Sequence, residues 1–339
     1  MPELSVIVPV YNATLYLQKC LDSLANQTLE KIEVILIVDE GTKDNSGDIV
    51  DEFVASRDAR FRAVRMPHAT LGEARNYGAT LARGDFIEFV DADDYVEPGF
   101  CEVPLLAAKS KAADIVTFRT RMITKVRGTE RIVECGFSSG TGPRQAMLKT
   151  TVMAWNKLYR KSFVEASGGF RYPACFHEDL CETPRLFANE PRAIAIDDVL
   201  YDYVRRGDSA SGLAPNRNDL DLLPVCRKLL EYADEYPRYT AEFEYIVEAQ
   251  LRGLLGAWKE SHGDWVAGGQ ETAQKLYDSL HPRFEDNPYI IMDRLANPGF
   301  SGVVSYIGRS VRSRTVKSVK KMPALFSLLE RTKFGIRKE

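Results

Sequence analysis

The first 94 residues of this chain predict an α/β fold with a parallel sheet between two layers of helices. Three short apolar runs rich in β-branched or aromatic residues, at 4–10, 32–38 and 86–90, are typical of strands buried on both faces. Helical patterns separate these runs, and parallel strands require crossover connections of this kind. Each run ends abruptly in polar residues, so we expect a ligand site at the edge where the strands end.

The first two strands and the helices after them follow in order. Leu4–Val10 is the first strand, and the next helix has an apolar face at helical spacing, formed by Leu17, Cys20, Leu21 and Leu24. Ile32–Val38 is the second strand, and it ends in a polar loop. Asp44 or Ser46 could cap the following helix, whose apolar residues are Ile49, Val50 and Phe53.

The third strand is predicted at Phe61–Val64 and is shorter than the others. A helix follows at Leu71–Arg83, and Gly84 is the expected signal at its C-terminal cap. The next strand, which begins at Phe86, runs directly into the sequence Asp91-Ala92-Asp93-Asp94. We expect this acidic turn to lie at the carboxyl edge of the sheet.

Asp91 and Asp93 are separated by one residue, so on an extended backbone both side chains point to the same side. Two carboxylates that converge in this way repel each other unless a positive charge lies between them. Mg²⁺ or Mn²⁺ would fill this position, since both prefer oxygen ligands. The alternative is a solvated acidic turn, because two aspartates at this spacing form a weak motif on their own.

The composition is that of a globular protein with 339 residues, of which 45% are hydrophobic and 27% charged. The net charge of −3 is unevenly distributed: residues 303–339 contain 10 Lys or Arg and 2 Asp or Glu. An acidic body with a basic tail is not the profile of a nucleic-acid-binding protein. The tail alternates basic with apolar residues, so it could bind an anionic membrane surface, or it could be solvated or packed on the helices.

The six cysteines are scattered and form no pair at the spacing of a zinc site, so neither a zinc site nor a disulfide framework is predicted. Several fall in apolar patterns and are expected to be buried thiols, as in a reducing cytoplasm. The N-terminus lacks the basic region of a signal peptide, and no apolar run approaches the ~20 residues that span a bilayer. We therefore expect a cytoplasmic protein, with the tail as a peripheral contact to the inner face of the membrane.

Several segments together resemble the family-2 glycosyltransferases, inverting enzymes of bacterial type that have the GT-A fold. In the first half, the resemblance is carried by Ser5–Asn12, Tyr16–Thr28, Val38–Gly41, Ala74–Gly78 and Asp91–Asp94. Later segments that match are Ala154–Arg160, His177–Asp179, Tyr201–Arg205 and Gly207–Ser209. No single segment is decisive, but six or more in the correct order, over roughly residues 4 to 212, are specific together.

The resemblance implies a nucleotide-sugar donor, with a UDP-sugar expected, at the edge of the sheet. Tyr11 would stack on the base, Asp39 would accept a hydrogen bond from the base or ribose, and Arg75 would lie near the phosphates. The implied donor-binding residues also include Pro9, Asp91 and Ala92. Asp93 would ligate the Mn²⁺ or Mg²⁺ ion that bridges the diphosphate.

Each of these assignments has a simpler alternative. Tyr11 could pack against the first helix, Arg75 could be a surface charge on its helix, and Lys43 is expected to be solvated. The family usually has two aspartates followed by Gly-Ser after the second strand, whereas this chain has Asp39-Glu40-Gly41-Thr42. Asp39 is retained, so the change at Glu40 bears on donor identity more than on activity.

The resemblance also implies a catalytic base that faces the acceptor hydroxyl. Asp179 is assigned to this role, and Glu178 is the less favoured candidate or a supporting group. A base and a Lewis acid on opposite sides of the anomeric carbon imply one displacement with inversion. The alternative is an acidic helix N-terminus that interacts with the helix dipole. His177 is expected to be a loop residue rather than a metal ligand.

Three regions are predicted along the chain. Residues 1–213 form the glycosyltransferase domain, with a nucleotide-binding half at 1–100 and an acceptor half at 101–213. Residues 214–302 form a helical region that covers the sheet or shapes the acceptor site, and residues 303–339 form the basic amphipathic tail.

The expected reaction is metal-assisted transfer of a hexosyl group to a hydroxyl of a glycan or lipid-linked acceptor, in synthesis of cell-surface polysaccharide. Two other classes of function remain open. A sugar nucleotidyltransferase would need a Gly-rich phosphate loop after the first strand, and residues 9–12 contain no glycine. A non-catalytic binding protein on the same fold would have lost the carboxylates, but Asp91, Asp93 and Asp179 are all present.

Overall fold

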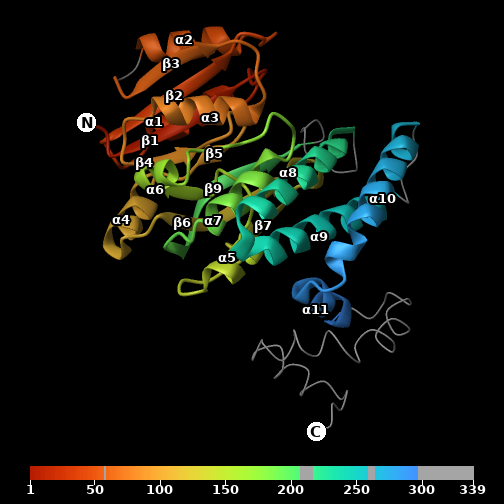
Figure 1. The fold of residues 1–339 in the computed structure, drawn as a ribbon. Coiled ribbons are helices and arrows are strands. Elements are labelled where there is room, and N and C mark those ends of the chain that lie inside the picture. The colour runs from red at the N-terminus through yellow and green to blue at the C-terminus, as the bar shows by residue number, and fades with distance from the viewer. Residues whose placement is uncertain (57–58, 207–216, 259–263, 297–339) are drawn as a thin grey trace. The chain divides into compact units, whose positions relative to one another are not determined.

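The computed structural model describes residues 1–56, 59–206, 217–258 and 264–296 (Figure 1). The chain divides into two compact units, Met1–Tyr232 and a second that begins at Ala233. The boundary predicted after residue 213 falls in 207–216, outside the described residues, as do the segment Gly207–Ser209 and the basic tail.

Within the described residues, nine strands of the first unit form one sheet. Its first part has the order β3-β2-β1-β4 with every pair parallel, which confirms the predicted parallel α/β unit. The four strands are β1 (Leu4–Val10), β2 (Ile32–Asp39), β3 (Phe61–Met66) and β4 (Phe86–Phe89). Their carboxyl ends therefore share one edge of the sheet.

The helices α1 (Leu17–Ala25), α2 (Ser46–Ser56) and α3 (Leu71–Leu81) connect these strands. All four residues of the apolar face predicted for α1 are buried. The Asp44 carboxylate accepts a hydrogen bond of 3.0 Å from the Ser46 backbone N–H at the start of α2, as one of the two predicted caps would. A capping box of Thr70 and Glu73 begins α3.

The end predicted for α3 is wrong. The helix stops at Leu81, and Ala82 has an extended backbone, so Gly84 is not its C-cap. Gly84 instead lies against β1, where an added Cβ would be 2.7 Å from the carbonyl carbon of Leu4. The glycine is needed for this close approach of two backbones rather than for a left-handed cap.

The second part of the sheet is mixed. β8 (Lys157–Arg160) pairs antiparallel with β4 and with β6 (Ile115–Thr124), and β6 pairs parallel with β9 (Ala193–Arg205). Two further short strands are β5 (Tyr95–Val96), on β9, and β7 (Thr129–Val133), on β6. The helices of this part are α4 (Glu102–Lys111), α5 (Pro143–Lys149), α6 (Lys161–Ala166), α7 (Glu178–Ala188) and α8 (Leu222–Glu235).

Aromatic packing supports the second part of the sheet. The ring of Trp155, just before β8, stacks on that of Tyr201 in β9 with 4.4 Å between centroids and 12° between planes. Phe100 packs edge-on against Phe118, and both are fully buried. All six cysteines are free thiols and five of them are buried, which confirms the predicted buried thiols.

The second unit is helical, as predicted for this region. Its described helices are α9 (Thr240–Trp258), α10 (Asp264–Phe284) and α11 (Pro288–Ala296). Val247, Leu251 and Leu254 of the predicted apolar pattern are buried. Among the described residues, no helix is both long enough and apolar enough to cross a membrane.

Candidate functional site

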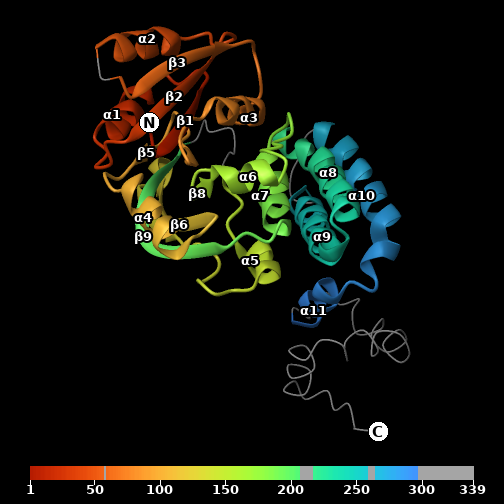
Figure 2. The same cartoon turned by 60° about the vertical axis from the view of Figure 1, so that its left-hand side comes forward.

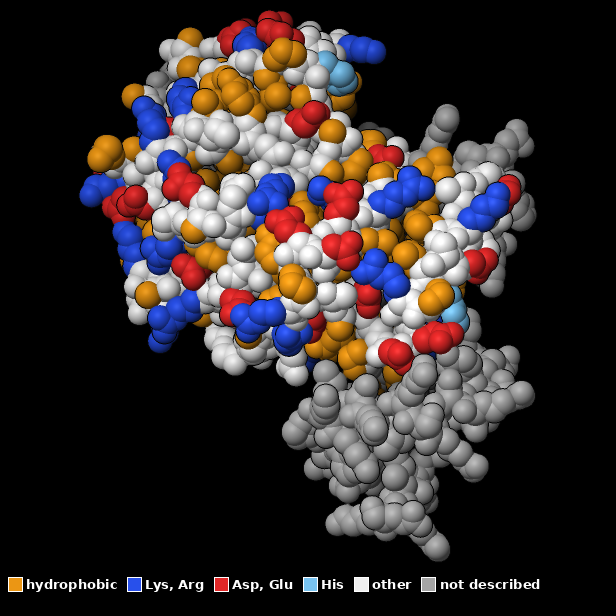
Figure 3. Space-filling model, in the orientation of Figure 1, with side chains coloured by type: hydrophobic (Ala, Val, Ile, Leu, Met, Phe, Trp, Pro, Cys, Tyr) orange, Lys and Arg blue, Asp and Glu red, His pale blue; other side chains and the backbone are white. Residues whose placement is uncertain are grey.

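Two groups of side chains lie beyond the ends of the parallel strands, at the edge of the sheet predicted for a ligand. The strands β1, β2 and β3 lie side by side in Figure 2. We call Tyr11, Asp39 and His68 the outer cluster and Arg75, Asp91 and Glu178 the inner cluster. Figure 3 shows charged side chains of both signs interspersed on one face of the molecule.

The outer cluster is built around the Asp39 carboxylate at the end of β2. It accepts hydrogen bonds from the backbone N–H of Gly41 at 2.6 Å and of Ala69 at 3.1 Å, and it contacts Nδ1 of His68 at 2.9 Å. The Tyr11 ring lies 5.4 Å from the His68 ring between centroids. Tyr11 is 46% exposed, so a face of this ring is available to a ligand rather than buried against α1.

Sequence reasoning missed His68, although a signal was present. His68 follows β3, the third parallel strand, and so lies at the same edge as the ends of β1 and β2. Gly41 makes room for it, because a Cβ there would be 2.7 Å from His68 Nδ1 and 2.9 Å from Asp39 Oδ1. Lys43 is exposed, as expected, and its backbone N–H donates to Asn12 Oδ1 at 2.8 Å.

The inner cluster is centred on Arg75 of α3, which is only 2% exposed. Its Nη2 donates to Asp91 Oδ1 at 2.7 Å, and its Nη1 donates to Glu178 Oε1. Burial acts against the charge, but the two carboxylates offset it and raise the pKa of the guanidinium above its ordinary value. Arg75 is therefore a fixed cation that joins the acidic turn after β4 to the start of α7.

These contacts differ from both expectations for Arg75. It is not a surface charge, and its guanidinium is engaged by two carboxylates rather than exposed at the edge where a phosphate would bind. The direct phosphate contact stays a prediction, while the structure favours a positioning role.

Further contacts lock α3 to the loop before α7. Asn76 donates from Nδ2 to the Tyr172 carbonyl at 2.9 Å and accepts from the Tyr172 N–H at 3.0 Å. A Cβ at Gly72 would be 2.7 Å from the Pro173 carbonyl oxygen, so this approach requires a glycine. The loop and the helix it leads into are thus held against the donor half by several independent contacts.

The three carboxylates of the acidic turn have three different environments. Asp91 pairs with Arg75, and Asp93 pairs with Arg206 at the end of β9. Asp94 is buried and accepts from the Tyr201 hydroxyl at 2.9 Å and the Val204 N–H at 2.8 Å. Burial raises the pKa of Asp94 well above its ordinary value, so this residue anchors β9 rather than facing a ligand.

Asp93 is the most accessible of the three, with 42% of its side chain exposed. Arg206 donates from Nη2 to its carboxylate and from Nη1 to its backbone carbonyl, at 3.0 Å. Nowhere in the described ranges do three or more His, Cys, Asp or Glu side chains gather as a metal site. Pro9 and Ala92 are also expected to bind the donor. Ala92 is buried, and Pro9 lies within β1, opposite Ile37 of β2.

Glu178 and Asp179 begin α7, after His177 in the left-handed region with φ of 64°. Glu178 is buried and paired with Arg75. Asp179 is half-buried, and its side chain forms no hydrogen bond or ion pair with the described residues. Burial raises the pKa of Asp179, and Arg75, His177 and Lys157 oppose this effect. The two adjacent carboxylates therefore have different environments. Glu178 is a buried ion-pair partner of Arg75, whereas the Asp179 carboxylate is available to accept a proton.

Lys157 is a second buried cation close to this helix. Its Nζ donates to the carbonyls of Thr151 and Met153 at 2.5 and 2.8 Å and to Asn156 Oδ1 at 2.7 Å. Burial lowers its pKa to about 7. Its hydrogen bonds fix the segment that precedes β8.

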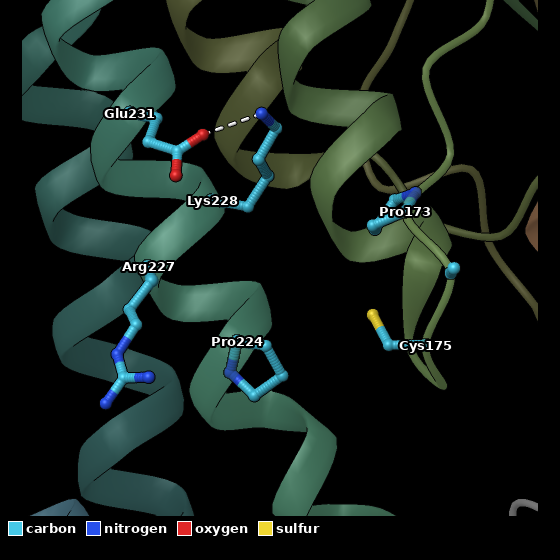
Figure 4. A pocket seen from close by; sticks show the side chains of 7 residues that line it. Pro173, Cys175, Pro224, Arg227, Lys228 and Glu231 are labelled. Atoms are coloured by element: carbon cyan, nitrogen blue, oxygen red, sulfur yellow. Dashed lines mark hydrogen bonds and ion pairs between the residues drawn. The ribbon is translucent and has the colours of Figure 1, made fainter.

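A groove of about 370 Å³ lies beside the loop that leads to α7. Figure 4 shows Pro173 and Cys175 of this loop on one side and residues of α8 on the other, among them Pro224, Arg227 and the ion pair of Lys228 with Glu231. None of the predicted site residues lines this groove. It is therefore a neighbouring surface, while the predicted residues lie at the open edge of the sheet.

Comparison with known proteins gives one matching family model, glycosyl transferase family 2, over residues 5–168. The uncharacterized glycosyltransferase EpsJ of Bacillus subtilis (strain 168) is 31% identical over 80% of this chain and 76% of its own length. EpsH of the same organism, also named as a glycosyltransferase, is 37% identical, but the match spans only 49% of each chain.

Among solved structures, residues 1–349 of S. aureus TarS in complex with UDP-GlcNAc align with a TM-score of 0.57. The alignment covers 84% of this chain and 92% of that one, at 15% sequence identity. At this identity the likeness concerns the fold, and it confirms the predicted GT-A fold, a sheet flanked by helices and followed by C-terminal helices.

Proposed function

Because this chain belongs to glycosyltransferase family 2, we propose that it is an inverting hexosyltransferase that uses a UDP-sugar and transfers the sugar to a hydroxyl group. The observation that carries the proposal is the Arg75 bridge. It ties Asp91, beside Asp93, to Glu178, beside Asp179. The acidic turn and the candidate base are therefore parts of one site, although they are far apart in the sequence.

The outer cluster supports the donor assignment. An exposed tyrosine ring provides a stacking surface for a nucleobase, and the Asp39 carboxylate can accept from an N–H or hydroxyl group. The TarS structure with a similar fold was solved with UDP-GlcNAc. A UDP-sugar at this edge would place its diphosphate toward Asp93.

The chemistry of Asp93 fits the predicted Mn²⁺ or Mg²⁺. Ions of this kind at phosphate sites commonly take one or two protein carboxylates, and substrate phosphates and waters complete the coordination. One accessible carboxylate meets this requirement, although no group of three ligands exists in the described residues. When bound there, the ion would neutralise negative charge on the departing diphosphate.

Asp179 is the proposed general base. Its carboxylate accepts the proton of the acceptor hydroxyl while the hydroxyl oxygen forms a bond to the anomeric carbon. The bond from that carbon to the diphosphate breaks on the opposite side, and the electron pair leaves with the nucleotide diphosphate. Attack opposite to the leaving group inverts the configuration. Glu178 holds the start of α7 in place through Arg75 and takes no part in the proton transfer.

We further propose that the acceptor is a glycan or lipid-linked glycan in cell-surface polysaccharide synthesis, reached at the inner face of the cell membrane. The groove of Figure 4, beside the loop before α7, offers polar and charged contacts for such an acceptor. The basic tail would supply the contact to anionic lipid, but it lies outside the described residues and this part rests on its sequence alone.

The proposal is tested by screening UDP-sugars for stabilisation of the folded protein with and without Mn²⁺, followed by an assay of transfer and of product anomeric configuration. A ligand that binds only the folded form raises the melting temperature. We expect at least one UDP-sugar to do so in a metal-dependent manner. Transfer with retained configuration would refute the single displacement, and transfer of a nucleotidyl group would favour the nucleotidyltransferase alternative.

A further inference from the structure

We propose that Arg206 competes with the divalent cation for Asp93, so that the metal and the nucleotide diphosphate bind cooperatively. This inference rests on the proposed function, because it concerns the metal and donor of the same site. It assigns a role to a residue that the sequence analysis did not single out, the last one described before 207–216.

Arg206 already places a positive charge at the Asp93 carboxylate, where a metal ion would bind. The guanidinium donates to the Asp93 carboxylate and, at 3.0 Å, to the Asp93 carbonyl oxygen. It is buried, even though the carboxylate that it contacts is 42% exposed. Two hydrogen bonds from a buried arginine, one to the side chain and one to the backbone of the same residue, hold the pair in a fixed geometry.

The neighbouring carboxylates of Asp91 and Asp94 cannot replace Asp93 as a metal ligand. The Asp91 carboxylate is held by Arg75, and Asp94 is buried with neutral donors on both of its oxygens. A metal at this turn must therefore use Asp93, and it must do so in competition with a fixed positive charge. Two cations on one carboxylate repel each other, so binding of the ion displaces the guanidinium.

A nucleotide diphosphate relieves the competition between Arg206 and the metal ion for Asp93. Its oxygens add ligands to the metal, and they accept hydrogen bonds from the displaced guanidinium. The Tyr16 ring gives the guanidinium a second partner nearby, with Arg206 Cζ 3.8 Å from the ring centroid. The metal therefore binds weakly alone and much more tightly together with the diphosphate.

The test measures Mn²⁺ binding to the full 339-residue protein, from the electron paramagnetic resonance signal of free Mn²⁺, with and without UDP. For the wild type we expect weak binding of Mn²⁺ alone and an affinity at least ~10-fold higher with UDP, within the usual range of coupling between sites. Arg206→Gln should bind Mn²⁺ alone ~10-fold more tightly and lose most of the enhancement by UDP. Arg206→Lys, which keeps a charge, should stay closer to the wild type.

Two controls decide the interpretation. Arg65→Gln removes an arginine whose partner, Asp51, lies elsewhere on the surface, and it should leave Mn²⁺ affinity unchanged. The double variant Arg206→Gln with Asp93→Asn should lose the gain in affinity. If the gain persists in the double variant, or if Arg206→Gln binds Mn²⁺ no more tightly than the wild type, the inference is overturned.

Failure of the inference is distinguishable from failure of the proposed function. The arm with Mn²⁺ alone involves no nucleotide and no transfer, so it tests only the competition at Asp93. Absence of any effect of UDP-sugars on wild-type stability would instead count against the donor assignment. A melting curve for each variant shows whether the protein has folded before its affinity is compared.

Discussion

The inner and outer clusters both begin at the ends of parallel strands, but they are built in opposite ways. The outer cluster is formed by short loops after β1, β2 and β3, and its tyrosine ring is open to solvent. The inner cluster joins α3, the turn after β4 and the start of α7, and its central arginine is buried.

This difference suggests that the outer cluster binds the ligand and that the inner cluster positions the catalytic groups. The outer cluster has a buried carboxylate, Asp39, next to the exposed rings of Tyr11 and His68. The exposed rings can admit a ligand and contact it directly, so changes there should affect affinity. A buried cluster that joins distant elements fixes the relative positions of Asp93 and Asp179, so changes there should affect stability and rate.

The largest effect is expected at Asp179, which borders the inner cluster. Asp179→Asn should reduce transfer by roughly 10²–10⁴, the usual contribution of a positioned acid–base group, with UDP affinity little changed. Because burial raises the pKa of Asp179, kcat should fall with decreasing pH above the range of an ordinary aspartate. A pH–rate profile and UDP titration check this. A crippling Glu178→Gln combined with a mild Asp179→Asn would reverse the assignment within the pair.

Arg75→Met should destabilise the first unit by about 3–5 kcal/mol, because removal of one partner from a buried ion pair leaves uncompensated charge. In this case Asp91 and Glu178 would face each other without a cation between them. Arg65→Met is the matched control, since its pair with Asp51 is exposed and should change stability by at most about 0.5 kcal/mol. Urea unfolding of both variants measures the difference. Equal unfolding midpoints would show that the buried ion pairs of Arg75 stabilise the protein no more than an exposed pair does.

Asp93→Asn should retain the fold, since this side chain lies at a half-exposed turn. Transfer should fall on the order of 10²-fold, as is typical when electrostatic stabilisation of a developing charge is lost. The assay is run with Mn²⁺, with Mg²⁺ and with excess chelator. Full activity of the variant, or of the wild type in chelator, would contradict the metal assignment.

Asp39→Asn tests the outer cluster. We expect UDP affinity to fall about tenfold, the equivalent of a hydrogen bond to a charged group, while kcat at saturating donor stays close to the wild type. His68→Gln is the companion variant, since it removes the imidazole that contacts Asp39. If Asp39→Asn lowered kcat with no change in UDP affinity, the proposed division between the clusters would fail.

The smallest effect on transfer is expected from truncation near Gly302, which removes the basic tail. Transfer to a soluble acceptor should survive, because both clusters lie before residue 213. Binding to anionic vesicles should be lost, since each basic residue near such a surface contributes about 1 kcal/mol that salt screens. A vesicle sedimentation assay at two salt concentrations measures this. Equal binding of full-length protein to neutral and anionic vesicles would exclude the electrostatic contact.

Local pattern alone was sufficient for the strands of the parallel part, the face of α1 and the acidic turn. These features depend on residues close in the sequence: a buried strand is a continuous apolar run, and an amphipathic helix repeats every 3.6 residues. The same local reasoning was wrong about Gly84, because the backbone of Leu4 that it approaches belongs to a strand about 80 residues earlier.

Which charged side chains meet depends on how distant elements pack. Arg75 and Glu178 are separated by 103 residues and Asp93 and Arg206 by 113, and no sequence period reports such pairings. Periodicity identifies the face of an element that is buried, but not the distant element that packs against it. The residue types and their positions at strand ends were therefore readable from the sequence, whereas the partners of Arg75, the presence of His68 beside Asp39 and the contact of Arg206 with Asp93 followed from packing.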